Sequence, residues 1–220
     1  WAAVNAARNM IKELKNRLSL IWEIETEQIA FENGNFSSKA DSELSINIRD
    51  LAKKLDGTGG AVSAVGSVDL DSSTHGFGTH IVDLEIDPET GKTDIIKYTA
   101  AQDVGRAIHP SYVEGQIQGG AAQGIGWALN EEYFIDEKGK MLNSSYLDYR
   151  MPTALDLPMI DTILVENENP EQPFGVRGVG EVPICPPLGA ISNAIKDALG
   201  IRLNDLPMKP SVILKALSEK

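Results

Sequence analysis

The spacing of apolar side chains predicts several helices. In residues 2–18 the apolar positions recur every three to four residues and so share one helical face; they are Ala3, Ala7, Met10, Ile11, Leu14 and Leu18. Similar spacing predicts helices over residues 46–55 and 188–199. Two further helices, one over about 110–129 and one from Pro210, begin with proline, which is tolerated at the first helical position.

Alternation of apolar and polar residues predicts the strands. Residues 80–87 place apolar side chains on one face and three acidic ones on the other, which is typical of a half-buried strand. A turn separates this strand from a returning one over residues 93–103, and shorter strands are predicted over 133–135 and 160–165. An Asn-Gly pair within residues 29–36 predicts a hairpin.

The order of these elements predicts an α+β fold with two parts. Strand pairs and helices are mixed without strict alternation, which argues against a doubly wound sheet. Residues 1–62 are expected to form a small helix–hairpin–helix lobe that serves as scaffold. Residues 63–220 are expected to form a larger lobe that carries the candidate chemistry.

Composition narrows the class of protein. The chain has 220 residues, of which 42% are hydrophobic and 24% charged, as in ordinary globular domains. No apolar run reaches the roughly 18 residues that span a bilayer, so no membrane partner is expected. The net charge of −12 argues against a nucleic-acid partner, because phosphate binding needs clustered Lys and Arg. The single cysteine fits a reducing, cytoplasmic location.

A glycine-rich segment falls inside the helix predicted over residues 110–129. It holds five glycines: Gly115, Gly119, Gly120, Gly124 and Gly126. Glycine in a helix interior costs about 1 kcal/mol relative to alanine, so the run calls for an explanation. One is a smooth face that a flat ligand approaches, and the other is close packing against a neighbouring element. Spacing alone favours neither.

A second segment holds a candidate base. Gly178 and Gly180 permit a backbone bend, and Glu181 follows at once among apolar residues. A carboxylate in apolar surroundings becomes a stronger base, because desolvation disfavours its charged form. The plainer alternative is an exposed loop glutamate, which composition alone favours.

Other candidates carry weaker signals. His75 and His80 have no carboxylate-rich motif between them, so no protein-ligated metal site is expected there. His109 is expected to begin a helix, and Cys185 is expected to be buried. Asp103 is expected to stabilise a turn.

Several motifs together resemble the C-terminal molybdopterin-binding region of the xanthine dehydrogenase and aldehyde oxidase family, the molybdenum hydroxylases. They occur in the family order, and the resemblance covers residues 78–217 strongly and the first sixty residues loosely. The motifs are Ala101–Pro110, Gly115–Gly126, Ser145–Pro152, Gly178–Glu181 and Gly200–Pro207.

The resemblance implies a chemistry and its residues. Glu181 aligns with the glutamate that acts as general base when such enzymes hydroxylate an aldehyde, an N-heterocycle or a similar small molecule with water. Gln123 aligns with a glutamine that contacts the cofactor, and the backbone of Gly124 and Gly180 is expected near it. The cofactor is a molybdopterin, alone or in its cytosine dinucleotide form, and its metal needs no protein side chain.

The resemblance also implies partners. Catalytic subunits of the family are several times longer, so the remaining molybdopterin-binding portion must come from elsewhere. Iron–sulfur and FAD groups are expected only on partner subunits or domains. The chain is therefore expected to be part of a molybdenum-dependent dehydrogenase or hydroxylase, inactive alone. The alternative is a cofactor-free scaffold or assembly fragment.

Overall fold

The computed structural model describes residues 1–69 and 75–219, which divide into two compact units, Trp1–Ser72 and Ser73–Lys220. The division falls further along the chain than the boundary predicted after residue 62. The first unit begins with α1 (Ala2–Trp22), which extends beyond the predicted residue 18. Its buried core consists of Leu14, Leu18, Ile29, Phe36, Leu51 and Leu55.

The predicted hairpin of the first unit is confirmed, and a third strand pairs with it. β1 (Ile29–Glu32) and β2 (Asn35–Ser38) are antiparallel, and the turn residues Asn33 and Gly34 have φ values of 48° and 81°. Such positive φ values are what an Asn-Gly turn supplies. β3 (Ser45–Asn47) pairs with β2.

The helix predicted over residues 46–55 is wrong at its start. Ile46 lies in β3 opposite Phe36, and α2 covers only Ile48–Ala52. Asn47 ends the strand and caps the helix, since its side-chain oxygen accepts a hydrogen bond from the Arg49 backbone N–H at 3.0 Å. The residues after α2 form a short 3₁₀ turn, Leu55–Thr58.

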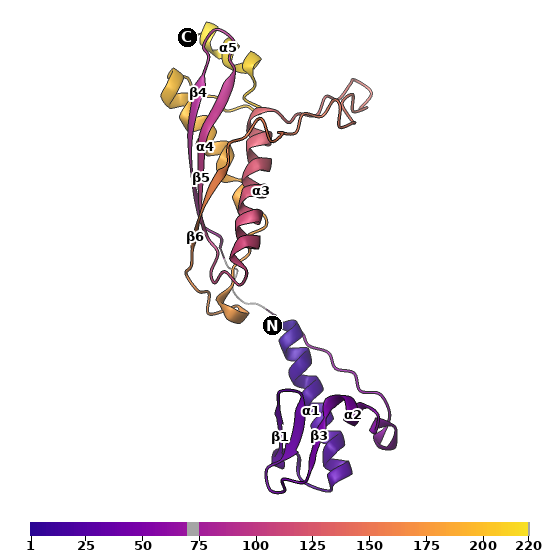
Figure 1. Cartoon of the computed structure of the whole chain (residues 1–220). Helices are drawn as coiled ribbons and strands as arrows, with labels where there is room; N and C mark the ends of the chain where they lie inside the picture. Colours follow the sequence, from indigo (N-terminus) through magenta and orange to yellow (C-terminus); the bar gives the residue numbers. More distant parts are fainter. Residues whose placement is uncertain (70–74, 220) are drawn as a thin grey trace. The chain divides into compact units, whose positions relative to one another are not determined.

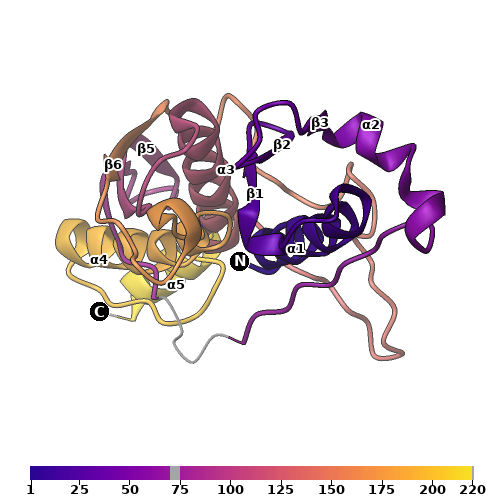
Figure 2. The same cartoon turned by 90° about the horizontal axis from the view of Figure 1, so that it is seen from below.

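The second unit is built on a three-stranded sheet. β4 (Gly78–Ile86) and β5 (Thr93–Asp103) are antiparallel, and β6 (Ile160–Val165) runs parallel to β5 on its other side. α3 (Pro110–Leu129) and α4 (Pro186–Leu199) both pack against this sheet, and α5 (Pro210–Ser218) follows near the C-terminus (Figures 1 and 2). These elements confirm the predicted α+β class.

One hydrophobic core joins the sheet to α3, α4 and α5. Its fully buried side chains include Tyr98, Ile117, Ile125, Ile191, Ile195 and Ile213. The predicted helix over 188–199 begins two residues earlier and ends at Gly200, whose φ of 71° suits a glycine helix cap. The predicted bounds of β5, α3 and β6 are confirmed.

The strand predicted over residues 133–135 is wrong. Residues 131–157, here called the arm, extend away from the end of α3 without entering the sheet (Figure 1). Ile135 makes only an isolated bridge with Met141. Large apolar side chains of the arm are exposed, with Tyr146, Leu147 and Leu155 at 90%, 95% and 98%. These side chains are apolar although the described part of this chain does not bury them.

His80 introduces a buried titratable group into the sheet. It is 9% exposed, and its Nδ1 lies 2.9 Å from the Tyr98 hydroxyl. Burial lowers the pKa of the His80 imidazole from 6.5 to about 4. The folded unit therefore holds the ring neutral at pH values where an exposed histidine is charged.

This lowered pKa predicts an acid-dependent loss of stability. The folded pKa lies below the unfolded value, so the unfolded chain binds the proton first as the pH falls. His80 therefore costs nothing above about pH 6.5 and removes up to about 3 kcal/mol of unfolding free energy as the pH approaches 4. Urea unfolding of wild type and His80→Gln between pH 4 and 8 measures this. The variant should lack that part of the pH dependence, and parallel curves would contradict the assignment.

Candidate functional site

The loop that precedes Glu181 is fastened to the end of β5. Gly105 and Val176 form an isolated bridge, the Arg177 backbone N–H donates to the Val104 carbonyl at 3.1 Å, and the Arg106 N–H donates to the Gly175 carbonyl at 2.9 Å. Gly105 has a φ of +64°, and a Cβ there would lie 2.3 Å from the Gly175 carbonyl oxygen. Only glycine fits this crossing of the two segments.

A buried ion pair reinforces the same crossing. Arg177 Nε lies 3.2 Å from Asp103 Oδ2, and the two side chains are 14% and 10% exposed. The other Asp103 oxygen accepts a hydrogen bond from the Gly105 N–H at 3.0 Å, as expected of a turn-stabilising aspartate. Sequence reasoning missed the ion pair. The signal in the sequence was a pair of opposite charges far apart in the chain: Asp103 in one motif and Arg177 next to another.

Glu181 lies at the rim of a cavity of about 370 Å³. Its lining residues are His75, Gly76, Arg177, Gly178, Gly180, Glu181 and Val182. Glu181 is exposed and directly precedes a short 3₁₀ turn, η4 (Val182–Ile184). Among the described residues, apolar side chains do not enclose the carboxylate, which agrees with the exposed loop glutamate that composition alone favoured. The apolar neighbours Val179 and Pro183 are turned inward instead, Val179 toward the core and Pro183 toward α3.

The middle of the glycine-rich face of α3 packs against η4. A Cβ on Gly120 would lie 2.9 Å from Pro183, and one on Gly124 would lie 2.4 Å from the Ile184 carbonyl oxygen and 2.7 Å from Pro187. Close packing therefore explains these two glycines. Gly124, predicted to approach the cofactor, is buried beneath Ile184 and Pro187.

Gly126 is also packed, since a Cβ there would lie 2.3 Å from Glu131 Oε1 and 2.6 Å from Pro152, but four other glycines of the two motifs are open. Among the described residues, no atom lies within 4 Å of a Cβ built on Gly115, Gly119 or Gly178. A Cβ on Gly180 would meet Gln116 Oε1 at 3.9 Å and nothing closer in that part of the chain. The backbone beside Glu181 is thus free for a close approach from outside.

Gln123 lies on the other side of η4. Its side chain is exposed and lines a cavity of about 500 Å³ together with Trp127, Glu131, Glu132, Tyr133, Tyr149, Ile184, Leu206 and Pro207. Val182 lines the Glu181 cavity and Ile184 lines this one, so η4 contributes a residue to the wall of each cavity. In the second cavity the Tyr149 hydroxyl donates to Glu131 Oε2 at 2.7 Å, which raises the pKa of Tyr149 to about 12.

Gln116 joins these residues, although sequence reasoning gave it no role. Gln116, Gly120, Gln123 and Gly124 are spaced at four, seven and eight residues and so share one face of α3. Both glutamine side chains are exposed, one beside Gly180 and the other beside Ile184. The two candidate segments therefore meet, with an exposed amide on each side of their contact.

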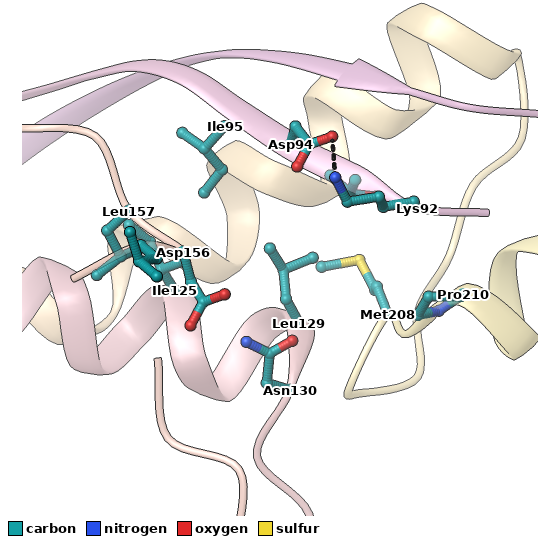
Figure 3. Close-up of a pocket in the computed structure, with 12 residues that line it drawn as sticks. Lys92, Asp94, Ile95, Ile125, Leu129, Asn130, Asp156, Leu157, Met208 and Pro210 are labelled. Atoms are coloured by element: carbon teal, nitrogen blue, oxygen red, sulfur yellow. Dashed lines mark ion pairs between the residues drawn. The ribbon is translucent and has the colours of Figure 1, made fainter. Parts of the chain in front are cut away.

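A third cavity, of about 280 Å³, lies near the start of β5 and the end of α3 (Figure 3). Ile95, Ile125, Leu129 and Leu157 form its apolar part, and Lys92 pairs with Asp94 at 2.8 Å on the β5 side (Figure 3). Asp156 Oδ2 accepts hydrogen bonds from the Thr153 N–H and hydroxyl, each at 2.7 Å. The charges here satisfy one another within the chain, so this cavity is not the candidate site.

The remaining candidates are placed as follows. His109 immediately precedes α3, as predicted. Cys185 is exposed, so its predicted burial is wrong; it lies between η4 and α4, where the chain turns at the surface. Across residues 1–69 and 75–219, no three His, Cys, Asp or Glu side chains gather as a metal site would require.

The comparison with known families follows this geometry. The sequence model of the molybdopterin cofactor-binding domain family matches residues 1–158.

The chain belongs to this family.

Relatives of this molybdopterin cofactor-binding domain include subunits of dehydrogenases. The chain is 41% identical over 153 residues to a putative xanthine dehydrogenase molybdenum-binding subunit of Escherichia coli, covering 69% of this chain and 20% of that one. It is 31% identical to the gamma subunit of the 6-hydroxypseudooxynicotine dehydrogenase complex of Paenarthrobacter nicotinovorans, covering 96% and 28%. The predicted resemblance to the xanthine dehydrogenase and aldehyde oxidase family is confirmed.

Solved structures agree in fold. Quinoline 2-oxidoreductase from Pseudomonas putida matches with a TM-score of 0.73 at 29% identity, over 96% of this chain and 28% of that one. CO dehydrogenase from Oligotropha carboxidovorans matches with a TM-score of 0.74 at 26% identity, over 97% and 28%.

The family model matches residues 1–158, so it includes the first sixty residues, where the resemblance was loose, and ends before Glu181. The chain spans about a fifth to somewhat over a quarter of the length of these relatives. Among the described residues, no helix combines the length and apolar content needed to cross a membrane.

Proposed function

We propose that the chain is the base-bearing part of the molybdopterin-binding subunit of a molybdenum hydroxylase. The proposed reaction is hydroxylation of an aldehyde, an N-heterocycle or a similar small molecule, with water as the oxygen source. The observation that carries the proposal is the meeting of the two candidate segments. η4 brings Glu181 and Gln123 to neighbouring cavities, and the matched molybdopterin cofactor-binding domain includes Gln123.

The residues at this contact fit a pterin cofactor. Open backbone at Gly178 and Gly180 leaves room for a flat ring beside Glu181. Gln116 and Gln123 offer uncharged amide donors that suit the oxygen and nitrogen acceptors of a pterin. The family cofactor holds its metal through its own sulfur atoms, so a site without a cluster of protein ligands is compatible with it. The bound cofactor, with or without a cytosine nucleotide, would supply the two-electron redox chemistry.

The chain's own contribution is a base and its placement. The Glu181 carboxylate accepts a proton as water-derived oxygen is transferred to the substrate. Its exposure in this chain means that another polypeptide segment must exclude water from the cavity. Desolvation by that segment would strengthen the carboxylate as a base.

Further polypeptide is therefore part of the proposal. The remaining molybdopterin-binding portion would complete the two cavities, and iron–sulfur and FAD subunits would carry electrons away. The relatives named as subunits of complexes support such an assembly, and so do the exposed apolar side chains of the arm. The unpaired Cys185 is compatible with the cytoplasm.

Elemental analysis tests the proposal. The purified chain should contain little molybdenum, whereas the complete molybdopterin-binding subunit that includes it should contain about one atom per copy. The complete subunit should then oxidise at least one of three probes: benzaldehyde, xanthine or quinoline. A complete subunit without molybdenum would contradict the proposal and favour a cofactor-free scaffold.

Gln123→Ala in the complete enzyme should weaken cofactor retention more than folding. A hydrogen bond to a charged group contributes about 1.5–3 kcal/mol, so molybdenum content or turnover should fall at least about tenfold when the cofactor is too scarce to saturate the enzyme. Gln118→Ala is the matched control, because the Gln118 amide already donates to the Ile160 carbonyl at 3.1 Å. The control should lower the unfolding free energy but not molybdenum content. Equal molybdenum content and turnover in Gln123→Ala and wild type would remove the assigned role.

A further inference from the structure

Arg177 joins three segments of the second unit. Its guanidinium forms an ion pair with Asp103 at the end of β5, with Nε and Oδ2 3.2 Å apart but not aligned for a hydrogen bond. One of its terminal nitrogens donates to the His75 carbonyl at 3.2 Å, and its backbone N–H donates to Val104. A guanidinium holds such contacts in a fixed planar arrangement, which a lysine ammonium does not.

The segment that Arg177 reaches is held from its other side as well. The Phe77 carbonyl accepts hydrogen bonds from the Gln102 side chain at 3.0 Å and from the Asp103 N–H at 2.8 Å. A Cβ on Gly76 would lie 2.5 Å from a Val182 methyl group, so Val182 packs directly on this segment. Residues 75–77 therefore contact the residues on both sides of the Gly178–Glu181 bend.

Within the bend, Val179 packs against the core, and the Glu181 carbonyl accepts a hydrogen bond from the Ile184 N–H at 3.3 Å. Within the described part of the chain, the Glu181 carboxylate has no hydrogen-bond or ion-pair partner. Gly178 and Gly180 add no side-chain contacts of their own, so the placement of Glu181 depends on the anchored residues around them. The fixed ends are Arg177 on one side and Val182 on the other, and both line the Glu181 cavity.

We infer that Arg177, held by Asp103, is a positioning residue that sets the location of the Glu181 carboxylate. It acts through the bend, since its Nε faces Asp103 and one terminal nitrogen donates to the His75 carbonyl. The inference rests on the proposed function of Glu181 as the base. A displacement of about 1 Å in a catalytic group costs up to about a hundredfold in rate, so this placement has a measurable effect.

The first test is independent of activity. The double variant Asp103→Asn, Arg177→Met removes both charges together and keeps an acceptor for the Gly105 N–H, which avoids leaving one buried charge unpaired. Hydrogen exchange of the 220-residue chain should become at least about tenfold faster in residues 178–184, with β5 protection unchanged. Unchanged exchange in residues 178–184 would overturn the inference. A general loss of protection would also do so, because it would show an ordinary stabilising pair.

The second test separates positioning from the proposed function. In the complete enzyme the double variant should lower kcat per molybdenum by about tenfold to a hundredfold with little change in KM. Arg177→Lys, which keeps the charge opposite Asp103, should recover part of that loss. Added to Glu181→Gln, the double variant should cause no further loss, because both changes act through the same carboxylate.

The outcomes are distinguishable. A further loss in the Glu181→Gln background overturns the inference while leaving Glu181 as the base. Normal activity of Glu181→Gln alone contradicts the proposed function instead, and it removes the catalytic part of the inference whatever the exchange data show.

Discussion

Gly124→Val is expected to lower the unfolding free energy of the second unit by about 3 kcal/mol. The added side chain would begin 2.4 Å from the Ile184 carbonyl oxygen and 2.7 Å from Pro187. Backbone and a proline ring cannot rotate away as a flexible side chain can, so α3 and η4 must separate. Because η4 directly follows Glu181, the same separation should disturb the proposed base.

Gly119→Val is the matched control on the same helix. No described atom lies within 4 Å of a Cβ at Gly119, and valine is a somewhat better helix former than glycine. This variant should therefore match wild type or exceed it slightly in stability. Urea unfolding of the three proteins, followed by far-ultraviolet circular dichroism, compares them. Equal stability of Gly124→Val and wild type would contradict the packing account of the glycine-rich face.

The elements that sequence predicted well are those whose signals are local. β5, α3 and β6 were predicted with their observed bounds, because alternation, a starting proline and flanking turns all lie within each segment. The Asn33–Gly34 turn was equally local, since both residues readily adopt positive φ. The family resemblance came from several such segments in order.

The features that sequence missed depend on contacts between distant segments. Ile46 was assigned to a helix because its pairing with Phe36 in β2 was not visible in its own neighbourhood. The strand expected at residues 133–135 failed because these apolar residues belong to the arm, and Ile135 is 62% exposed. The sequence analysis predicted a strand because apolar residues such as these are usually buried within their own chain.

The candidate site shows the same division. The glycines beside Glu181 and in α3 were found, but spacing could not say which of them face a partner element. The structure answers this for Gly120 and Gly124, which contact Pro183, Ile184 and Pro187. Composition alone favoured an exposed Glu181, and the side chain is exposed, because the apolar residues around it in sequence point elsewhere in space.

Glu181→Gln in the complete enzyme is expected to lower turnover by about a hundredfold or more. Glutamine keeps the size of the side chain and can still hydrogen-bond, so the bend between Gly178 and η4 should persist. A neutral amide is far too weak a base to accept the proton, and positioned general-base catalysis contributes about 10²–10⁴-fold. Substrate binding and molybdenum content should change little, since the lost interaction matters chiefly in the transition state.

A structural glutamate would give a different pattern. Its replacement would lower stability or molybdenum content, and activity would fall only in proportion to the cofactor lost. Glu89→Gln, on an exposed turn residue outside both cavities, provides the control for a general effect of removing one carboxylate.

The most direct measurement is the rate at which substrate reduces the complete enzyme under anaerobic conditions, divided by its bound molybdenum. The substrate is whichever of benzaldehyde, xanthine or quinoline the wild type oxidises. We predict that Glu181→Gln is reduced at least about a hundredfold more slowly per molybdenum than wild type, with Glu89→Gln unchanged. A Glu181→Gln rate per molybdenum within a few-fold of wild type would contradict the account and leave Glu181 as an exposed loop residue.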